Sequence, residues 1–285
     1  MNNFKKFTNA FSIILITIIP FIANAQKLPG VQEKSLHAPA TVKIDGNLKE
    51  WGDDFQAYNK ATGIYYTMAN DEKNLYFIMR SSDQVINNKF IGGGISITIN
   101  TTGKKNDKNA YVIEYPLVDL AGLRKQVMSL KPTAQTPTTP GMSGMDSATV
   151  AMRRRALTTI KEIKLTGFAA DVPDQVISVY NGYSIKTAVD YDDKGNLSCE
   201  IAIPLKYLHL NGNAFAYNIK MNGINMVALM HPEMSGNLAA GDGNGGDRQY
   251  SATPDMPPAM ARAMGDMQNM VSPTDFWGEY TLAKK

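Results

Sequence analysis

The sequence predicts an all-β protein: an antiparallel β-sandwich of jelly-roll type with long loop insertions and one or two short helices. The chain holds many short segments rich in Val, Ile, Tyr, Phe and Thr, several of which alternate apolar with polar residues. Such segments are typical of strands. The chain shows neither the strand–helix alternation of a parallel sheet nor the period of a repeat protein.

Apolar, β-branched and aromatic residues define the predicted strands. In chain order these are 75–81, 94–100, 111–117, 163–168, 176–180, 183–191, 197–204, 215–227 and 280–283. Turn-forming sequences fit between them: NDEKN at 70–74 precedes the first strand, TGKKND at 102–107 separates the second from the third, and DDKGN at 192–196 predicts a hairpin turn. Many short strands joined by such turns favour a sandwich.

Two loop-rich insertions interrupt the strand pattern. The first, near 131–160, is rich in Pro, Thr, Gly, Ser and Met, and a short helix is expected at its end, over 155–160. The second, near 232–273, contains a second predicted helix at 259–270. Loops of this length in a compact domain are usually functional or disordered.

Residues 1–25 have the three parts of a secretory signal peptide. Lys5 and Lys6 form a basic stretch, residues 11–22 an apolar stretch, and Ala-Asn-Ala at 23–25 fits a cleavage site. The apolar stretch is shorter than the ~20 residues that span a bilayer, and no cysteine stands beside the cleavage site to carry a lipid. We therefore expect a periplasmic or secreted protein with no stable membrane insertion after cleavage.

The expected mature chain, residues 26–285, fits one sandwich domain. The net charge of the full chain is +3 and falls to +1 without the two signal-peptide lysines, because residues 1–25 contain no Asp or Glu. A nearly neutral chain offers no electrostatic reason to bind nucleic acid. Cys199 is the single cysteine, so no internal disulfide can form, and its alternating surroundings predict a strand residue rather than a nucleophile.

Several strings of residues stand in an order known from one family. They are VKIDGNLKEW at 42–51, NLYF at 74–77, EIAIPL at 200–205 with Leu208, YNI at 217–219 and FWGEYTL at 276–282. Together they resemble the family 9 carbohydrate-binding modules and their wider relatives, the DOMON-like β-sandwiches. The resemblance covers most of residues 40–283, with the two loop-rich segments as insertions.

The resemblance implies a sugar-binding β-sandwich, in which aromatic rings pack against the apolar faces of sugars and polar side chains fix the hydroxyl groups. Trp277, beside the last strand, is the best candidate for stacking. Trp51 lies in the shared opening string, where a packing role is favoured over stacking. Tyr66 is a further candidate platform, together with Tyr65, Tyr180 and Tyr183.

Arg80 and Asp83 leave the strand 75–81 together. They could donate to and accept from sugar hydroxyls, or they could pair with each other at the surface, and the pair is the favoured interpretation.

No catalytic constellation is visible, so we assign no catalytic and no metal-binding residue and expect a non-catalytic protein. The three histidines are scattered, and the chain contains no HExxH, GxSxG or CxxC. The string GDGNGGD at 241–247 lacks the strand, helix and Lys-Ser/Thr of a phosphate loop. It predicts a flexible loop, with a weak calcium loop through Asp242, Asn244 and Asp247 as the alternative.

The sixteen methionines of the chain suggest a second class of function, the binding of a metal or haem. Met230 and His231 lie close together in the sequence, and further methionines recur from 256 to 270, where Met260, Met264 and Met267 share one helix face. Thioethers and imidazoles suit Cu(I) or haem iron, and some DOMON-like relatives bind haem through Met with His or Lys. The alternative is that these methionines fill irregular packing.

Three functions follow from these observations. The first is an exported, non-catalytic binder of a glycan or oligosaccharide, linked to polysaccharide recognition or breakdown and needing no cofactor. The second is a haem- or copper-binding periplasmic protein that uses Met230 and His231 or the methionines of 260–270. The third is an envelope structural or interaction protein without a small ligand.

Overall fold

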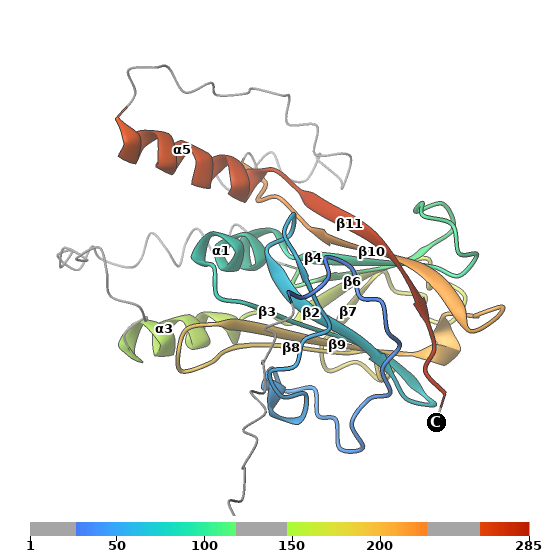
Figure 1. Cartoon of the computed structure of the whole chain (residues 1–285). Helices are drawn as coiled ribbons and strands as arrows, with labels where there is room; N and C mark the ends of the chain where they lie inside the picture. The colour runs from blue at the N-terminus through green and yellow to red at the C-terminus, as the bar shows by residue number, and fades with distance from the viewer. Residues whose placement is uncertain (1–26, 118–146, 227–256, 285) are drawn as a thin grey trace, which may run out of the picture.

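Two antiparallel sheets packed face to face form the framework of the protein (Figure 1), and the predicted fold class is confirmed. The computed structural model describes residues 27–117, 147–226 and 257–284. In the five-stranded sheet the strand order is β1-β2-β3-β9-β8, and in the six-stranded sheet it is β11-β10-β4-β5-β6-β7.

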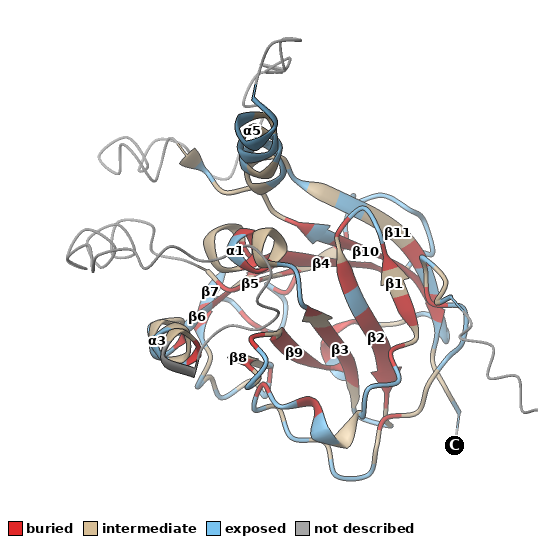
Figure 2. Ribbon diagram, turned by 60° about the vertical axis from the view of Figure 1, so that its left-hand side comes forward, coloured by how far each residue is buried: buried red, intermediate tan, exposed pale blue. Residues whose placement is uncertain are grey.

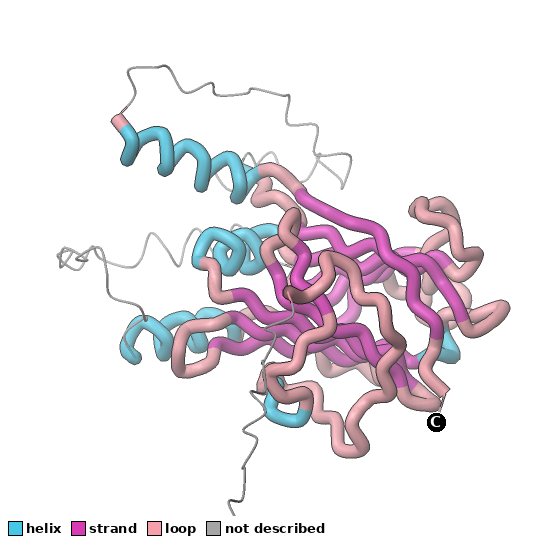
Figure 3. Tube along the Cα trace, in the orientation of Figure 1, coloured by secondary structure: helices cyan, strands magenta, loops and turns pink. Residues whose placement is uncertain are grey.

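The elements have the following bounds. The five-stranded sheet consists of β1 (Ala57–Asn59), β2 (Ile64–Asn70), β3 (Asn74–Ser81), β8 (Lys186–Tyr191) and β9 (Leu197–Pro204). The six-stranded sheet consists of β4 (Ile95–Asn100), β5 (Tyr111–Tyr115), β6 (Glu162–Thr166), β7 (Val176–Ser178), β10 (Ala214–Met221) and β11 (Thr274–Thr281). The described helices are α1 (Gln84–Gly93), α3 (Ser147–Leu157) and α5 (Pro258–Val271), with 3-10 turns at Leu48–Glu50 and Leu205–Tyr207. The α-helices lie at the same end of the sandwich (Figure 3).

The structure corrects several predicted boundaries. β10 ends at Met221 rather than continuing to 227, because the chain passes so close to α5 that a Cβ at Gly223 would overlap the carbonyl oxygen of Val271. β11 begins at Thr274, well before the predicted start at 280. The predicted helix at 155–160 is the end of α3, which begins at Ser147 and stops at Leu157, and the helix predicted at 259–270 is α5.

The sequence missed β1, β2 and α1. β2 (IYYTMAN) is buried on both faces apart from Tyr65, as is β9, which the sequence did predict. The Ile, Tyr and Thr residues of β2 are typical of a strand. The helix α1 begins where the carboxylate of Asp83 accepts hydrogen bonds from the N–H groups of Val85 and Ile86, at 2.8 and 3.1 Å. It ends at Gly94, whose φ of +74° favours glycine.

Alternation along the strands builds the core between the sheets. The three isoleucines of β4 are fully buried there, whereas Ser96, Thr98 and Asn100 lie on the outer face of the six-stranded sheet. Because side chains have a period of two along a strand, the same reasoning assigns every second residue of β10 and β11 to that outer face. Figure 2 shows the buried residues concentrated on the strands.

A pair of tyrosines joins the two sheets through the core. The hydroxyl oxygens of Tyr66 on β2 and Tyr217 on β10 lie 3.0 Å apart, and the hydroxyl of Tyr66 accepts a hydrogen bond from the backbone N–H of Gln32 at 2.9 Å. The ring of Tyr217 lies against Gly278 of β11, where any Cβ would overlap it. Gly278 is therefore required for the close approach of the ring to the edge strand.

Residues 27–56 form a third layer that covers the outer face of the five-stranded sheet (Figure 1). Apolar side chains of this segment pack on four residues that the sheet points outward. The segment contributes Leu28, Leu36, Ala38, Val42, Ile44, Leu48, Trp51 and Phe55, and the sheet contributes Ala69, Tyr76, Ile78 and Ala202. This layer explains why β2 and β9 are buried on both faces.

Asn70, at the end of β2, ties this layer to the C-terminal residues. Its backbone N–H donates to the carbonyl of Leu36 at 3.1 Å, and its own carbonyl accepts from the N–H of Ala38 at 2.8 Å. Its side-chain oxygen accepts from the hydroxyl of Tyr280 at 3.0 Å and from the N–H of Ala283 at 2.7 Å. One amide residue thus holds the start and the end of the described chain.

Glu200 on β9 anchors the layer from beneath. Its side chain is fully buried, and one carboxylate oxygen accepts hydrogen bonds from the N–H groups of Asp45 and Gly46 at 3.0 and 2.8 Å. The other oxygen accepts from the indole N–H of Trp51 at 3.0 Å. Burial raises the pKa of Glu200 to about 7, against the opposing effect of these three hydrogen bonds.

Parts of the chain lie outside the described residues. They include the predicted signal peptide 1–25 and most of the two loop-rich insertions. Among the described helices, none combines the length and the apolar character needed to cross a membrane.

The buried carboxyl of Glu200 should make stability depend on pH. In the folded chain Glu200 holds its proton up to about pH 7, whereas in the unfolded chain it releases the proton near its model value of 4.5. The folded state therefore binds more protons between these values, so the free energy of unfolding should fall as pH rises through this window, by up to about 3 kcal/mol. Urea unfolding from pH 4 to pH 8 would measure this slope.

The variant Glu200→Gln should lose this part of the pH dependence, because an amide does not titrate. The exposed Glu33 offers a matched control, and Glu33→Gln should keep the wild-type slope. An unchanged slope in Glu200→Gln would show that other groups cause the pH dependence.

Candidate functional site

The five residues that the sequence suggests for ligand binding do not form one site. Trp51 and Arg80 belong to the covered side of the five-stranded sheet, Tyr66 lies in the core, and Asp83 begins α1. Trp277 lies on β11, on the outer face of the other sheet.

Tyr66 cannot serve as a stacking platform in this structure. Its side chain is fully buried, its ring centroid lies 5.3 Å from that of Phe276, and its hydroxyl is bonded to Tyr217. Its neighbour Tyr65 points the opposite way and is 38% exposed. The one-residue difference decides which of the two tyrosines faces solvent.

Trp51 packs in the outer layer, as its favoured interpretation expects. Its ring centroid lies 5.8 Å from that of Tyr76, and its N–H is held by the carboxylate of Glu200. Its role is structural in two ways: the ring packs within the layer, and the N–H donates to a buried acceptor.

Arg80 and Asp83 do not pair with each other, which corrects the favoured prediction. The guanidinium of Arg80 instead pairs with the carboxylate of Asp53, whose pKa it lowers, and lies over the ring of Phe55 at 5.2 Å from the centroid. Asp83 is occupied as the N-cap of α1. Sequence proximity misled because the strand ends between the two residues, at Ser81.

Trp277 is the predicted residue that lies partly exposed on the outer face of the six-stranded sheet, where Asn218 and Thr98 beside it are buried. It is partly exposed, in register with Asn218 of β10, which in turn is in register with Thr98 of β4. Asp275 and Glu279 stand on either side of Trp277 along β11, on the same face, and both are exposed. The strand pattern therefore sets an indole between two carboxylates.

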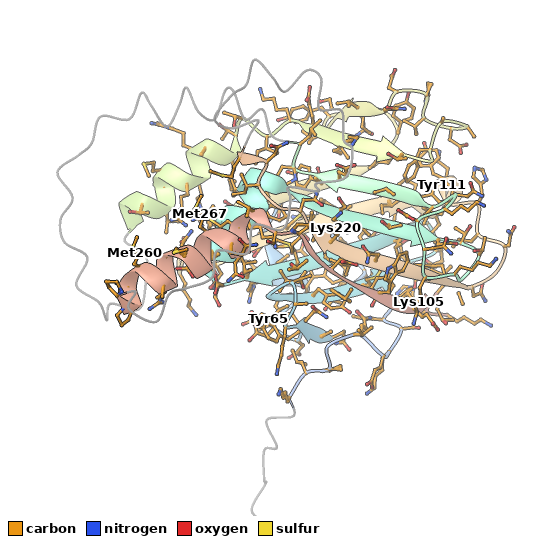
Figure 4. The ribbon with its side chains drawn as sticks, turned by 90° about the horizontal axis from the view of Figure 1, so that it is seen from above. Tyr65, Lys105, Tyr111, Lys220, Met260 and Met267 are labelled. Carbon is orange, nitrogen blue, oxygen red and sulfur yellow. The ribbon has the colours of Figure 1, made fainter. Side chains whose placement is uncertain are left out.

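Polar groups continue from this indole across the sheet. The exposed Lys220 stands opposite Asp275, and the amide of Asn218 donates to the carboxylate of Asp275 at 2.6 Å. Figure 4 labels Lys220 on β10 and Lys105 in the loop between β4 and β5, and Lys105 pairs with Glu279 at 3.0 Å. We call this set the Trp277 face; its members are Ser96, Thr98, Asn218, Lys220, Asp275, Trp277 and Glu279.

Two other surfaces carry exposed tyrosines. Tyr65 packs against Tyr58 and Phe55, with ring centroids 4.5 and 5.9 Å away, so aromatic neighbours already occupy its ring. Tyr180 is 83% exposed and lines a groove of about 700 Å³ beside β8. Asn181 and Lys186 supply polar groups to that groove, whereas Val179 and Val189 supply apolar surface.

Several predicted cofactor ligands cannot be placed. Met230, His231 and the calcium-loop candidates Asp242, Asn244 and Asp247 lie outside the described residues. Within the described ranges, no cluster of three or more His, Cys, Asp or Glu side chains could hold a metal ion. Cys199 is fully buried, and burial raises the pKa of its thiol well above the usual range, which does not suit a nucleophile.

In comparisons with known proteins, no family model, no curated protein and no solved structure matches this chain.

Asn218, Lys220, Asp275 and Glu279 were not predicted from the sequence as site residues. A signal was present in the second half of β10, where Asn218 and Lys220 alternate with Tyr217, Ile219 and Met221 and predict a polar face. What the sequence did not show was that β10 and β11 pair over their full length, which brings that polar face beside Trp277.

Asp83 should matter for stability rather than for ligand contact. Replacing it with Ala removes the two hydrogen bonds that its carboxylate accepts at the start of α1 and should lower the free energy of unfolding by about 1 kcal/mol. Urea denaturation compares this variant with Asp54→Ala, which changes an exposed aspartate outside any helix. Equal stability of the two variants would contradict the capping role.

Proposed function

We propose that this protein is an exported, non-catalytic glycan-binding protein that holds a sugar on the Trp277 face. One observation carries the proposal: a partly exposed indole stands between two exposed carboxylates and beside an amide and an ammonium group, on one sheet face. A sugar ring presents an apolar C–H face and a rim of hydroxyls, and this combination of side chains complements both.

The charges on the face suit hydroxyl recognition. Carboxylates accept hydrogen bonds from sugar hydroxyls, whereas the ammonium group of Lys220 can donate to them. The buried amide of Asn218 donates to Asp275 and to the carbonyl of Phe276 and so positions the Asp275 carboxylate. The positive charge of Lys220 stands opposite the negative charge of Asp275, and Glu279 is paired with Lys105. The face therefore carries no large net charge. A neutral oligosaccharide therefore fits this face better than a strongly anionic one.

The spacing of the two acids argues against glycoside hydrolysis on this face. Asp275 and Glu279 are separated by four residues of a strand, which is roughly 13 Å at about 3.3 Å per residue. Glycosidases place their two carboxyl groups within about 5–9.5 Å of each other. The pair can hold hydroxyls at two points but is too far apart to share one glycosidic bond.

The predicted signal peptide and the family resemblance support the same proposal from the sequence side. An exported protein meets polysaccharides outside the cytoplasm. The strings at 42–51 and 200–205 that carry the resemblance are joined in the folded chain by the hydrogen bonds of Glu200. These strings therefore support the sandwich, whereas binding itself rests on the Trp277 face.

The test is a screen of neutral and acidic oligosaccharides on an array, followed by calorimetry with the best ligand. Trp277→Ala should weaken binding by about tenfold to a hundredfold, since a buried aromatic contact is worth about 1.5–3 kcal/mol. The melting temperature should change little, because Trp277 lies outside the core cluster.

Tyr65→Ala and Tyr180→Ala are the matched controls, since each removes an exposed aromatic ring elsewhere. Both should keep the wild-type affinity. Loss of binding in Tyr180→Ala alone would move the sugar to the groove beside β8 and overturn the assignment to Trp277. A folded protein that binds none of the oligosaccharides would overturn the glycan-binding function.

A further inference from the structure

The helix α5 presents methionine side chains that the core does not use. No residue of this 14-residue helix is buried, although the helix packs against α1 and its C-terminal end is held by the hydrogen bond from the N–H of Ile224 to the carbonyl of Met270, at 2.9 Å. Met260 is 58% exposed and Met267 is 51% exposed (Figure 4). Core packing therefore does not explain these side chains.

The spacing of these methionines brings three of them to one side of the helix. Residues four and three positions apart are neighbours on a helix surface, with Cβ atoms about 5–6 Å apart, so Met260, Met264 and Met267 form one row. Arg262, the basic residue of the helix, is offset from Met260 by about 200° at 3.6 residues per turn. The methionine row therefore lies on the side of the helix opposite to the positively charged Arg262.

A row of thioethers, exposed at Met260 and Met267 and half-buried at Met264, has a specific metal preference. Thioether sulfur is a soft ligand that selects Cu(I) and is a poor ligand for hard ions such as Mg²⁺ or Ca²⁺. Methionine side chains have three rotatable bonds, so neighbouring sulfurs along the row can turn toward one ion. The row contains no charged ligand, which suits a monovalent ion.

We propose that the α5 methionine row, Met260, Met264 and Met267, is a binding site for Cu(I). The site is independent of the Trp277 face, because it lies on a different element and uses sulfur rather than hydroxyl-recognising groups. The protein thereby has a metal-binding function besides the proposed glycan binding.

The test is a titration with Ag⁺, a redox-inert probe for Cu(I), monitored by NMR of ¹³C-methyl-labelled methionines in the full chain. The methyl resonances of Met260, Met264 and Met267 should shift together and saturate. Met152 on α3, which is 54% exposed, is the internal control and should not shift. Shifts of Met152 equal to those of the row would overturn the proposal.

A triple variant, Met260→Leu, Met264→Leu and Met267→Leu, separates metal binding from docking of an apolar partner. Leucine keeps the apolar surface and the helix propensity but removes the sulfur, so affinity for Ag⁺ and for Cu(I) kept reduced by ascorbate should fall by at least about tenfold. Met152→Leu should leave both affinities unchanged. Wild-type affinity in the triple variant would overturn the site, since the ion would then be held elsewhere.

Discussion

The buried carboxylate of Glu200 is the contact on which the outer layer of the protein depends. Its two oxygens accept hydrogen bonds from Asp45, Gly46 and Trp51, and Gly46 reaches its acceptor with a φ of +86° that favours glycine. A buried acid is tolerated only where such donors satisfy it. The donors of the layer thus meet a buried acceptor of the sheet, in addition to the apolar contacts between the two. These hydrogen bonds fix the position of the turn at 45–46 on the sheet.

This layer also determines which surfaces a ligand can reach. It covers the outer face of the five-stranded sheet. There Trp51 is packed within the layer, and Asp53 of the layer forms an ion pair with Arg80 of the sheet. The outer face of the six-stranded sheet keeps its exposed charged side chains around Trp277. Two sheets of similar construction therefore differ in role: one supports the N-terminal segment, and the other offers an aromatic and polar surface.

Sequence reasoning predicted the sandwich because most strands are half-buried or short and apolar, with clear turns between them. It missed β2, although β2 is covered by the same layer as β9, which was predicted as a short apolar strand. Trp277 was found as a single residue, whereas its neighbours depend on the pairing of β10 with β11, a long-range contact that composition does not reveal.

Asn70 binds both the beginning and the end of the described chain, and this has a consequence for the order of folding. Until Tyr280 and Ala283 have left the ribosome, the amide oxygen of Asn70 lacks both partners and the six-stranded sheet lacks its edge strand β11. Contacts between such distant residues close late, because the long loop between them must first be ordered. Completion of the fold therefore waits for Tyr280 and Ala283, and the N-terminal layer gains its last hydrogen-bonded support only when β11 has paired with β10.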